Sequence, residues 1–173
     1  MPKRPTFAQV HRRSLDDKEA FWSEQAELIH WEKPFKKVCD YRNPPFANWF
    51  VGGKTNLCYN AVDRHAEKHP KRKALIWVST EVDKEVVYTF AELQSEVQRM
   101  AAILKSLGVK KGDRVLVYMP MVPEAVFAML ACTRIGALHS VVFGGFASVS
   151  LASRIDDAQP SVIVSADAGS RGG

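Results

Sequence analysis

The feature that most constrains the fold is a regular alternation of apolar runs and helical patterns in the second half of the chain. Apolar runs at 115–118, 140–143 and 161–164 are separated by helical patterns at 123–135 and 148–158. Continuous apolar runs of this length are typical of parallel strands, which are covered on both faces. A helix between successive parallel strands forms a right-handed crossover. The sequence therefore predicts an α/β fold built on a β-α-β-α-β unit with a parallel sheet.

A hairpin and a capped helix are predicted just ahead of this unit. The apolar residues at 74–78 and 86–88 flank Asp83-Lys84, which favours two antiparallel strands joined by a turn. Thr89-Phe-Ala-Glu92 has the form of a capping box, and Gly108 stands where a glycine usually follows a helix. The region from residue 73 onward thus has a consistent set of start and stop signals.

The helix expected over 123–135 opens at Pro123 and closes at Gly136. It is apolar on more faces than one small sheet covers. The last residues form a glycine-rich loop directly after a strand, where an α/β domain would continue. We therefore expect the domain to continue beyond residue 173, so that this chain is the truncated start of a longer one.

Residues 1–72 have a different texture, rich in Trp, Phe, Pro and charge at irregular spacing. We expect a helix from a Ser14 cap to Trp31, extended loops separated by Pro34 and by a turn at Asn43–Pro45, and a second helix from Asn56 to His69. The aromatic residues need another surface to cover. The region is thus predicted to be a helical and irregular wrapping extension, with domains at 1–72 and 73–173.

The net charge of +5 invites a nucleic-acid or membrane interpretation, but the basic residues are scattered and form no arm. A mild positive excess also suits an enzyme with polyanionic substrates. Cys39, Cys58 and Cys132 form no C-x-x-C pair, which disfavours a disulfide framework or a zinc site. No apolar segment is long enough for a membrane span, and no secretory signal opens the chain. The expected compartment is the reducing cytoplasm, with no nucleic-acid or membrane partner.

Two glycine-containing segments are candidate binding loops. Val141–Phe146 ends a predicted strand in Gly144-Gly145, which either makes a tight turn or lets a phosphate approach. Ser165–Gly173, with Arg171 between glycines, is either an anion-binding loop or simply a chain end. The chain has no G-x-G-x-x-G fingerprint, phosphate-binding G-x-x-x-x-G-K-[ST] loop or G-x-S-x-G elbow.

A polar cluster of Asn56, Asn60, Asp63 and Arg64 falls on one helical face at spacings of three and four. A catalytic role is possible, but a hydrogen-bonded structural anchor is favoured. The chain has no convincing pair of carboxylates for general acid–base catalysis.

A resemblance to a known family is carried by six segments in order along the chain: Asn43–Arg64, Tyr88–Leu93, Gly108–Val115, Tyr118–Met121, Ile135–Phe146 and the tail from Arg154. These segments resemble the short-chain acyl-CoA ligases of the adenylate-forming superfamily, the acetate– and propionate–CoA ligases. Pro44-Pro45-Phe46 and Ser165–Gly173 are more similar to the propionate branch than to the acetate branch.

The resemblance implies a reaction in two steps. ATP and a short carboxylate, propionate or acetate, form an acyl-adenylate with Mg²⁺, and coenzyme A then attacks to give a thioester. By the same resemblance, Phe143, Gly144 and Gly145 lie along the coenzyme A site. Arg171, Gly172 and Gly173 contact the nucleotide end of coenzyme A.

The resemblance also implies what this chain lacks. The family's phosphate loop, acyl pocket, hinge aspartate and carboxy-terminal domain with its catalytic lysine would all lie downstream, so no catalytic residue is expected here. The 173-residue chain is expected to be inactive without the remainder of its own sequence. Two alternatives stand beside this one: a non-catalytic module that binds coenzyme A, a nucleotide or another protein, and a nicotinamide enzyme, which the missing fingerprint disfavours.

Overall fold

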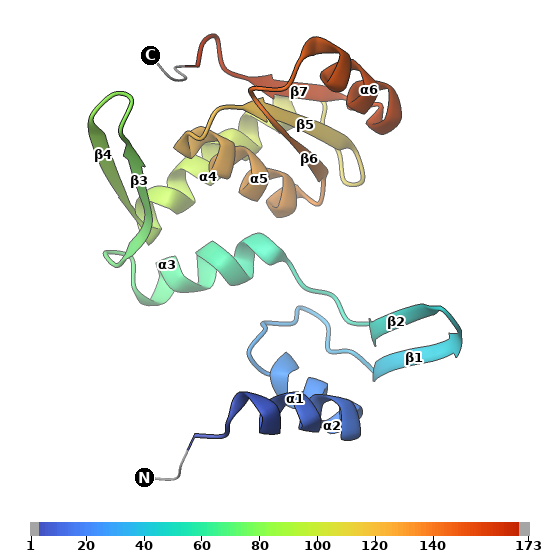
Figure 1. Ribbon diagram of the computed structural model, residues 1–173. Helices are drawn as coiled ribbons and strands as arrows, with labels where there is room; N and C mark the ends of the chain where they lie inside the picture. Colours follow the sequence, from blue (N-terminus) through green and yellow to red (C-terminus); the bar gives the residue numbers. More distant parts are fainter. Residues whose placement is uncertain (1–3, 170–173) are drawn as a thin grey trace. The chain divides into compact units, whose positions relative to one another are not determined.

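The computed structural model describes residues 4–169, and its contacts divide the chain into two compact units, Met1–Thr55 and Asn56–Gly173 (Figure 1). The second unit carries the alternating pattern. Its elements are η1 (Tyr59–Asp63), α3 (Arg64–Lys68), β3 (Lys73–Ser79), β4 (Lys84–Thr89), α4 (Phe90–Ser106), β5 (Arg114–Met119), α5 (Pro123–Ile135), β6 (Leu138–Phe143), α6 (Ser148–Ala158) and β7 (Val162–Ser165).

The parallel sheet of the second unit has the strand order β6-β5-β7, with β5 in the centre. Val117 of β5 lies opposite Val141 on one side and Val164 on the other. Helices α4 and α5 cover one face, and α6 lies on the other (Figure 1). The predicted β-α-β-α-β unit is therefore confirmed, with one crossover helix on each face.

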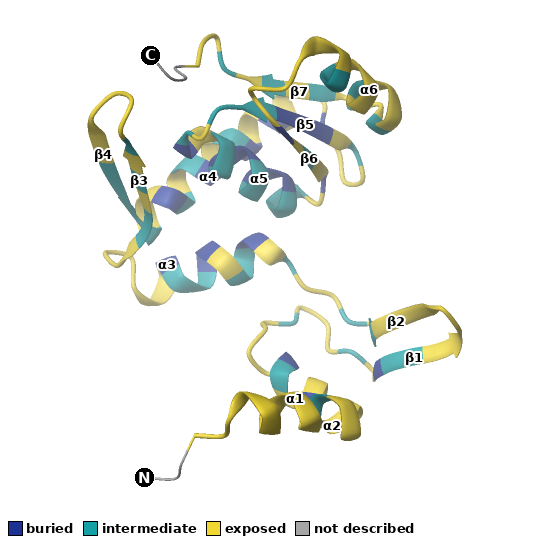
Figure 2. Ribbon diagram, in the orientation of Figure 1, coloured by how far each residue is buried: buried dark blue, intermediate teal, exposed yellow. Residues whose placement is uncertain are grey.

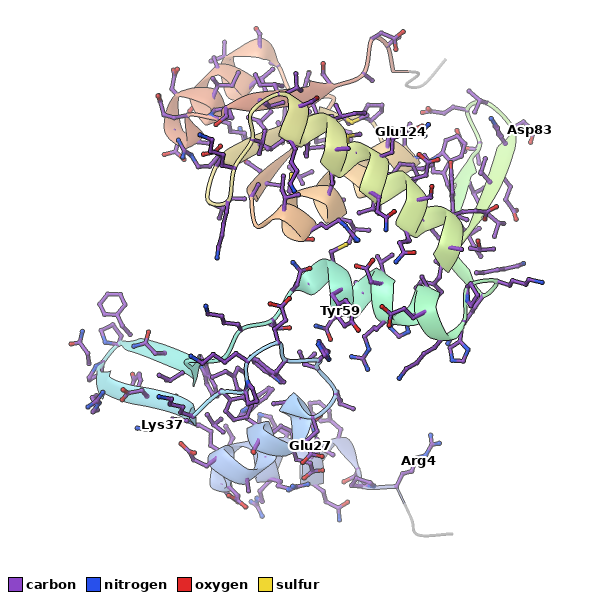
Figure 3. The ribbon with its side chains drawn as sticks, turned by 180° about the vertical axis from the view of Figure 1, so that it is seen from behind. Arg4, Glu27, Lys37, Tyr59, Asp83 and Glu124 are labelled. Carbon is purple, nitrogen blue, oxygen red and sulfur yellow. The ribbon has the colours of Figure 1, made fainter. Side chains whose placement is uncertain are left out.

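The helix caps and the hairpin turn predicted in this unit are confirmed. Thr89 and Glu92 exchange the hydrogen bonds of a capping box, and α4 is followed by Gly108 at φ +88°. Helix α5 begins at Pro123 and ends at Gly136, whose φ of +77° lies in the left-handed region that glycine tolerates. The β3–β4 hairpin forms as expected, and Figure 3 shows Asp83 at its turn.

The core of the second unit lies between the sheet and the α4–α5 pair. Its buried cluster joins residues of η1, α4, β5 and α5, among them Val62, Val97, Leu104, Val115 and Phe127. Figure 2 shows the burial concentrated on β5 and on the inner faces of these helices. The segment Asn56–His69 forms the expected second helix, with a π-helical turn at η1 that the sequence pattern did not reveal.

The first unit consists of α1 (Phe7–Asp16), α2 (Lys18–Ala26), β1 (Lys37–Asn43) and β2 (Phe46–Val51). The expected helix start at Ser14 is wrong. The chain enters α1 at Thr6, which forms a reciprocal capping box with Gln9, and the helix breaks at Asp17, whose φ is −128°. Ser14 instead donates a hydrogen bond to the His11 carbonyl inside α1.

The extended loops expected after Pro34 are also wrong, because this stretch forms the antiparallel hairpin β1–β2. The turn predicted at Asn43-Pro44-Pro45 is confirmed, because Pro44 and Pro45 lie between the two strands. These strands were not predicted, because their residues do not show the alternation of apolar and polar side chains that marks a half-buried strand. The domain boundary at residue 72 stays a prediction. Within residues 4–169, no helix combines the length and apolar character of a membrane span.

Candidate functional site

A groove of about 410 Å³ opens at the carboxyl ends of β5 and β6. The chain leaves β5 toward α5 on one face of the sheet and leaves β6 toward α6 on the other. Neighbouring strands whose connections diverge in this way leave a crevice at their carboxyl ends, where α/β proteins bind ligands. The lining residues are Trp77–Val82 from the β3–β4 hairpin, Pro120–Val122, Phe143–Gly145, Ala168 and Gly169.

Gly144 is required by space in this groove. A Cβ atom on Gly144 would lie 3.1 Å from the carbonyl carbon and oxygen of Met119 and 3.2 Å from the Pro120 nitrogen. Such contacts are tighter than ordinary van der Waals distances, and backbone atoms have little freedom to move away. The turn after β6 therefore packs directly on the loop after β5, and any larger residue would push the two walls apart.

The turn after β6 is held from below by side chains of β5 and α6. Tyr118 donates its hydroxyl to the Phe146 carbonyl at 3.1 Å, and the Arg154 guanidinium lies 4.8 Å from the centre of the Phe146 ring. Phe146 in turn meets Phe143 edge-to-face at 6.0 Å. These contacts give Phe143, whose side chain is half-exposed, a defined position on the groove wall.

The opposite wall comes from the β3–β4 hairpin. The Trp77 indole donates a hydrogen bond to the Met121 carbonyl at 2.7 Å, across 44 residues of sequence. Among the described lining residues, Glu81 carries the only charge. The described walls therefore consist mainly of apolar residues and glycines, with the polar Ser79 and Thr80 beside Glu81, and carry no positive charge to neutralise phosphate.

The structure brings three of the predicted site residues together. Phe143, Gly144 and Gly145 all line the groove, at the end of β6. Arg171, Gly172 and Gly173 lie outside the described residues. The groove-lining role of Met121 was missed, although its place directly after a central parallel strand is a signal that could have indicated it. Trp77 carried no such signal.

The polar cluster on the second helix forms a structural anchor, as the sequence analysis favoured. The Asp63 carboxylate accepts two hydrogen bonds from Arg134, at 2.8 and 2.9 Å, and one from Gln94 at 2.7 Å. Asn56 donates its amide to the carbonyls of Thr133 and Arg134 in the last turn of α5, where carbonyls lack a full set of intrahelical partners. The cluster thus ties η1 to α4 and α5.

The remaining members of this anchor make local contacts. Asn60 donates to the Asn56 carbonyl at 3.0 Å and accepts from Arg64 at 3.0 Å. Cys58 accepts a weak hydrogen bond from Arg134, but burial raises the pKa of its thiol, and burial raises that of Cys132 to about 11. Both thiols are therefore neutral at ordinary pH and unsuited to nucleophilic attack.

Metal-binding side chains do not gather in the part of the chain that the structure describes. Within residues 4–169, no group of three or more His, Cys, Asp or Glu side chains has the proximity to hold an ion. The described residues therefore form no cage of three or more such side chains around a metal ion.

Two family models match adjacent parts of the chain. Residues 7–61 match the model described as the acetyl-coenzyme A synthetase N-terminus, and residues 62–171 match the model described as AMP-binding enzyme. The second match alone covers more than half of the chain.

Curated relatives and a solved structure agree with these matches. Propionate–CoA ligases of Salmonella typhimurium and Escherichia coli are 60% and 58% identical over 97% of this chain. An acetyl-coenzyme A synthetase of Deinococcus radiodurans is 49% identical over 98%. The structure of an acetoacetyl-CoA synthetase from Streptomyces lividans superposes with a TM-score of 0.86 at 33% identity, over 95% of this chain and 25% of its own. The chain spans 27% of the length of the two propionate–CoA ligases and 26% of the acetyl-coenzyme A synthetase.

Proposed function

The chain belongs to the AMP-binding enzyme family, and from this premise we propose that it is the amino-terminal part of a propionate–CoA ligase. One observation carries the choice of propionate: 60% and 58% identity to two propionate–CoA ligases, against 49% to an acetyl-coenzyme A synthetase. The alternative substrate, acetate, is favoured by the match of residues 7–61 to the acetyl-coenzyme A synthetase N-terminus.

The proposed reaction has two half-reactions. The propionate carboxylate attacks the α-phosphorus of ATP, forming propionyl-adenylate and releasing diphosphate. The sulfur of coenzyme A then attacks the acyl carbon, forming the thioester and releasing AMP. Mg²⁺ would neutralise triphosphate charge in the first step, and we assign none of residues 4–169 to hold it.

The contribution of this chain is to the coenzyme A site. We assign Phe143, Gly144 and Gly145 to a wall that contacts coenzyme A, because they line one groove at the carboxyl ends of the parallel strands. Arg171, with Gly172 and Gly173, is assigned to the phosphorylated nucleotide end. The lack of a positive charge on the described walls supports this division, because a cationic partner for phosphate has to come from elsewhere. The cytoplasmic location is part of the same proposal.

The substrate assignment is tested with the full-length parent enzyme. We expect acid-dependent ATP–pyrophosphate exchange and thioester formation, with a higher kcat/KM for propionate than for acetate. A higher value for acetate would select the alternative substrate. Absence of exchange with both acids, in a folded full-length protein, would remove the ligase proposal and leave a non-catalytic binding module.

The 173-residue chain alone is expected to form no acyl-adenylate, because it spans only about a quarter of the length of its ligase relatives. Exchange activity of the purified chain above a mock preparation would contradict this.

The coenzyme A assignment is tested by Arg171→Ala in the parent. A hydrogen bond to a charged group contributes roughly 1.5–3 kcal/mol, so affinity for coenzyme A should fall about 10- to 150-fold. Pyrophosphate exchange uses no coenzyme A and should stay near wild type. Arg12→Ala, at an exposed position of α1, is the matched control and should change neither half-reaction. An equal loss in both half-reactions for Arg171→Ala would indicate a structural role instead.

A further inference from the structure

One side-chain hydrogen bond joins the two walls of the groove that come from different sheets. Strands β3 and β4 pair only with each other among the described strands, and the parallel sheet is separate. The Trp77 indole bridges them by donating to the Met121 carbonyl at 2.7 Å. Both residues line the groove, and Trp77 is half-buried.

The loop that Trp77 holds is also the surface on which the other walls rest. The Cα of Gly144 is so close to Met119 and Pro120 that a Cβ there would meet their backbone at 3.1–3.2 Å. Gly169, on the segment after β7, faces the Pro120 ring, which a Cβ would meet at 3.6 Å. The position of residues 119–121 therefore sets the width of the groove on three sides.

We propose that Trp77 is a positioning residue for coenzyme A: its indole N–H holds the 119–121 loop in the place that leaves the groove open beside Gly144 and Gly145. This inference rests on the proposed function, because it takes the groove to be the coenzyme A site. It assigns Trp77 a role in the thioester half-reaction and none in acyl-adenylate formation.

The expected size of the effect follows from the way Trp77 acts. A residue that acts through a loop changes ligand affinity by no more than the free energy with which it holds that loop. The net contribution of one neutral hydrogen bond corresponds to a change in ligand affinity of about 2- to 12-fold. The effect should therefore be smaller than that of Arg171→Ala.

The test is Trp77→Phe in the full-length parent, which keeps an aromatic ring and removes the N–H donor. We expect the KM for coenzyme A to rise about 2- to 12-fold. Acid-dependent pyrophosphate exchange should be unchanged. A fold defect that only lowers the amount of active enzyme would reduce both rates and leave the KM for coenzyme A where it was, so the KM separates positioning from general stability.

The chain offers a closely matched control. Trp31 also donates its indole N–H to a backbone carbonyl, that of Ala26 at 2.9 Å, but it belongs to the first unit and is not one of the lining residues of the groove. Trp31→Phe should leave the KM for coenzyme A unchanged.

A double-mutant cycle with Gly144→Ala distinguishes action through the loop from direct contact with the ligand. The added methyl displaces residues 119–120, so it should already weaken the Trp77 bond. The double variant should then raise the KM by less than the product of the two single effects. Independent, multiplicative effects would mean that Trp77 does not act through the loop, and would overturn the proposal.

Failure of this inference differs from failure of the proposed function. If Gly144→Ala raises the KM for coenzyme A and Trp77→Phe does not, the groove assignment survives and the role of Trp77 is wrong. If the wild-type parent forms no thioester from any short carboxylate, the ligase function itself is wrong.

Discussion

The two compact units use the same local devices in very different surroundings. The second unit buries a continuous cluster that joins η1, α4, β5 and α5. In the first unit the buried residues among those described are Phe21, Ala26 and Val38, and helix α1 buries none (Figure 2). Its contacts include pairs of partly buried aromatic rings, such as Trp31 with Phe50 at 5.3 Å.

This difference teaches where local interactions become part of global stability. A hydrogen bond or ion pair in the second unit is tied to elements that unfold together, whereas the same bond in α1 or in the β1–β2 hairpin can open alone. Each unit has a threonine capping box, an aspartate–arginine pair and at least one leucine on a helix. Matched substitutions can therefore break or sharpen the comparison.

The largest expected difference is between two leucines. Leu104 on α4 is 1% exposed, so Leu104→Ala should lower the free energy of unfolding by about 2–5 kcal/mol. Leu15 on α1 is 62% exposed, and Leu15→Ala should change it by less than about 0.5 kcal/mol. Urea denaturation followed by circular dichroism measures both. Equal losses would mean that α1 is packed as tightly as α4.

The next difference concerns the two ion pairs. In Arg134→Met, Asp63 loses both bonds from the guanidinium and keeps its Gln94 bond, and its side chain is 9% exposed. A loss of roughly 1.5–3 kcal/mol in unfolding free energy is expected, less any share that the quarter-exposed Arg134 already loses to solvent screening. Arg42→Met in the β1–β2 hairpin, where Arg42 is 86% exposed, should leave the thermal midpoint unchanged. A comparable drop in stability in Arg134→Met and Arg42→Met would show that the two ion pairs contribute equally to global unfolding.

Smaller effects are expected at the capping boxes. Thr89→Ala removes the cap of a helix packed in the core and should lower global stability by about 1 kcal/mol. Thr6→Ala removes the same cap from α1, which buries no residue. Its effect should appear as faster amide hydrogen exchange within α1, with no shift of the global unfolding transition. A global shift for Thr6→Ala would show that α1 unfolds with the rest.

The smallest effect is a titration in the first unit. The Arg42 guanidinium, by hydrogen bonding to Asp40, lowers the pKa of that carboxyl to about 2. Because the folded pKa is below the ordinary value, any stabilisation is complete above about pH 3.9 and is lost as pH falls toward 2. Carboxyl NMR titration should place Asp40 near 2, and near its ordinary value in Arg42→Met. An identical pKa of Asp40 in the wild type and in Arg42→Met would show that Arg42 does not cause the shift.

Prediction from sequence succeeded where signals are local. The bounds of α5 and α6, the β3–β4 hairpin and the cap of α4 follow from residues within one or two turns of each boundary. The first unit was predicted less well, because the start at Ser14 competed with an equally good signal at Thr6. The β1–β2 strands lack the alternation that marks a half-buried strand.

From residue 73 onward, the sequence by itself determined the order of strands and helices, the parallel sheet, and the place of Phe143–Gly145 at a strand end. Only the tertiary structure decided which distant residues share the groove with them. Trp77 and Met121 are 44 positions apart, and their contact depends on how the β3–β4 hairpin stands beside the parallel sheet. Periodicity and capping are encoded over a few residues, whereas the packing of one sheet beside another depends on the side chains of both. Only the folded chain brings these side chains together.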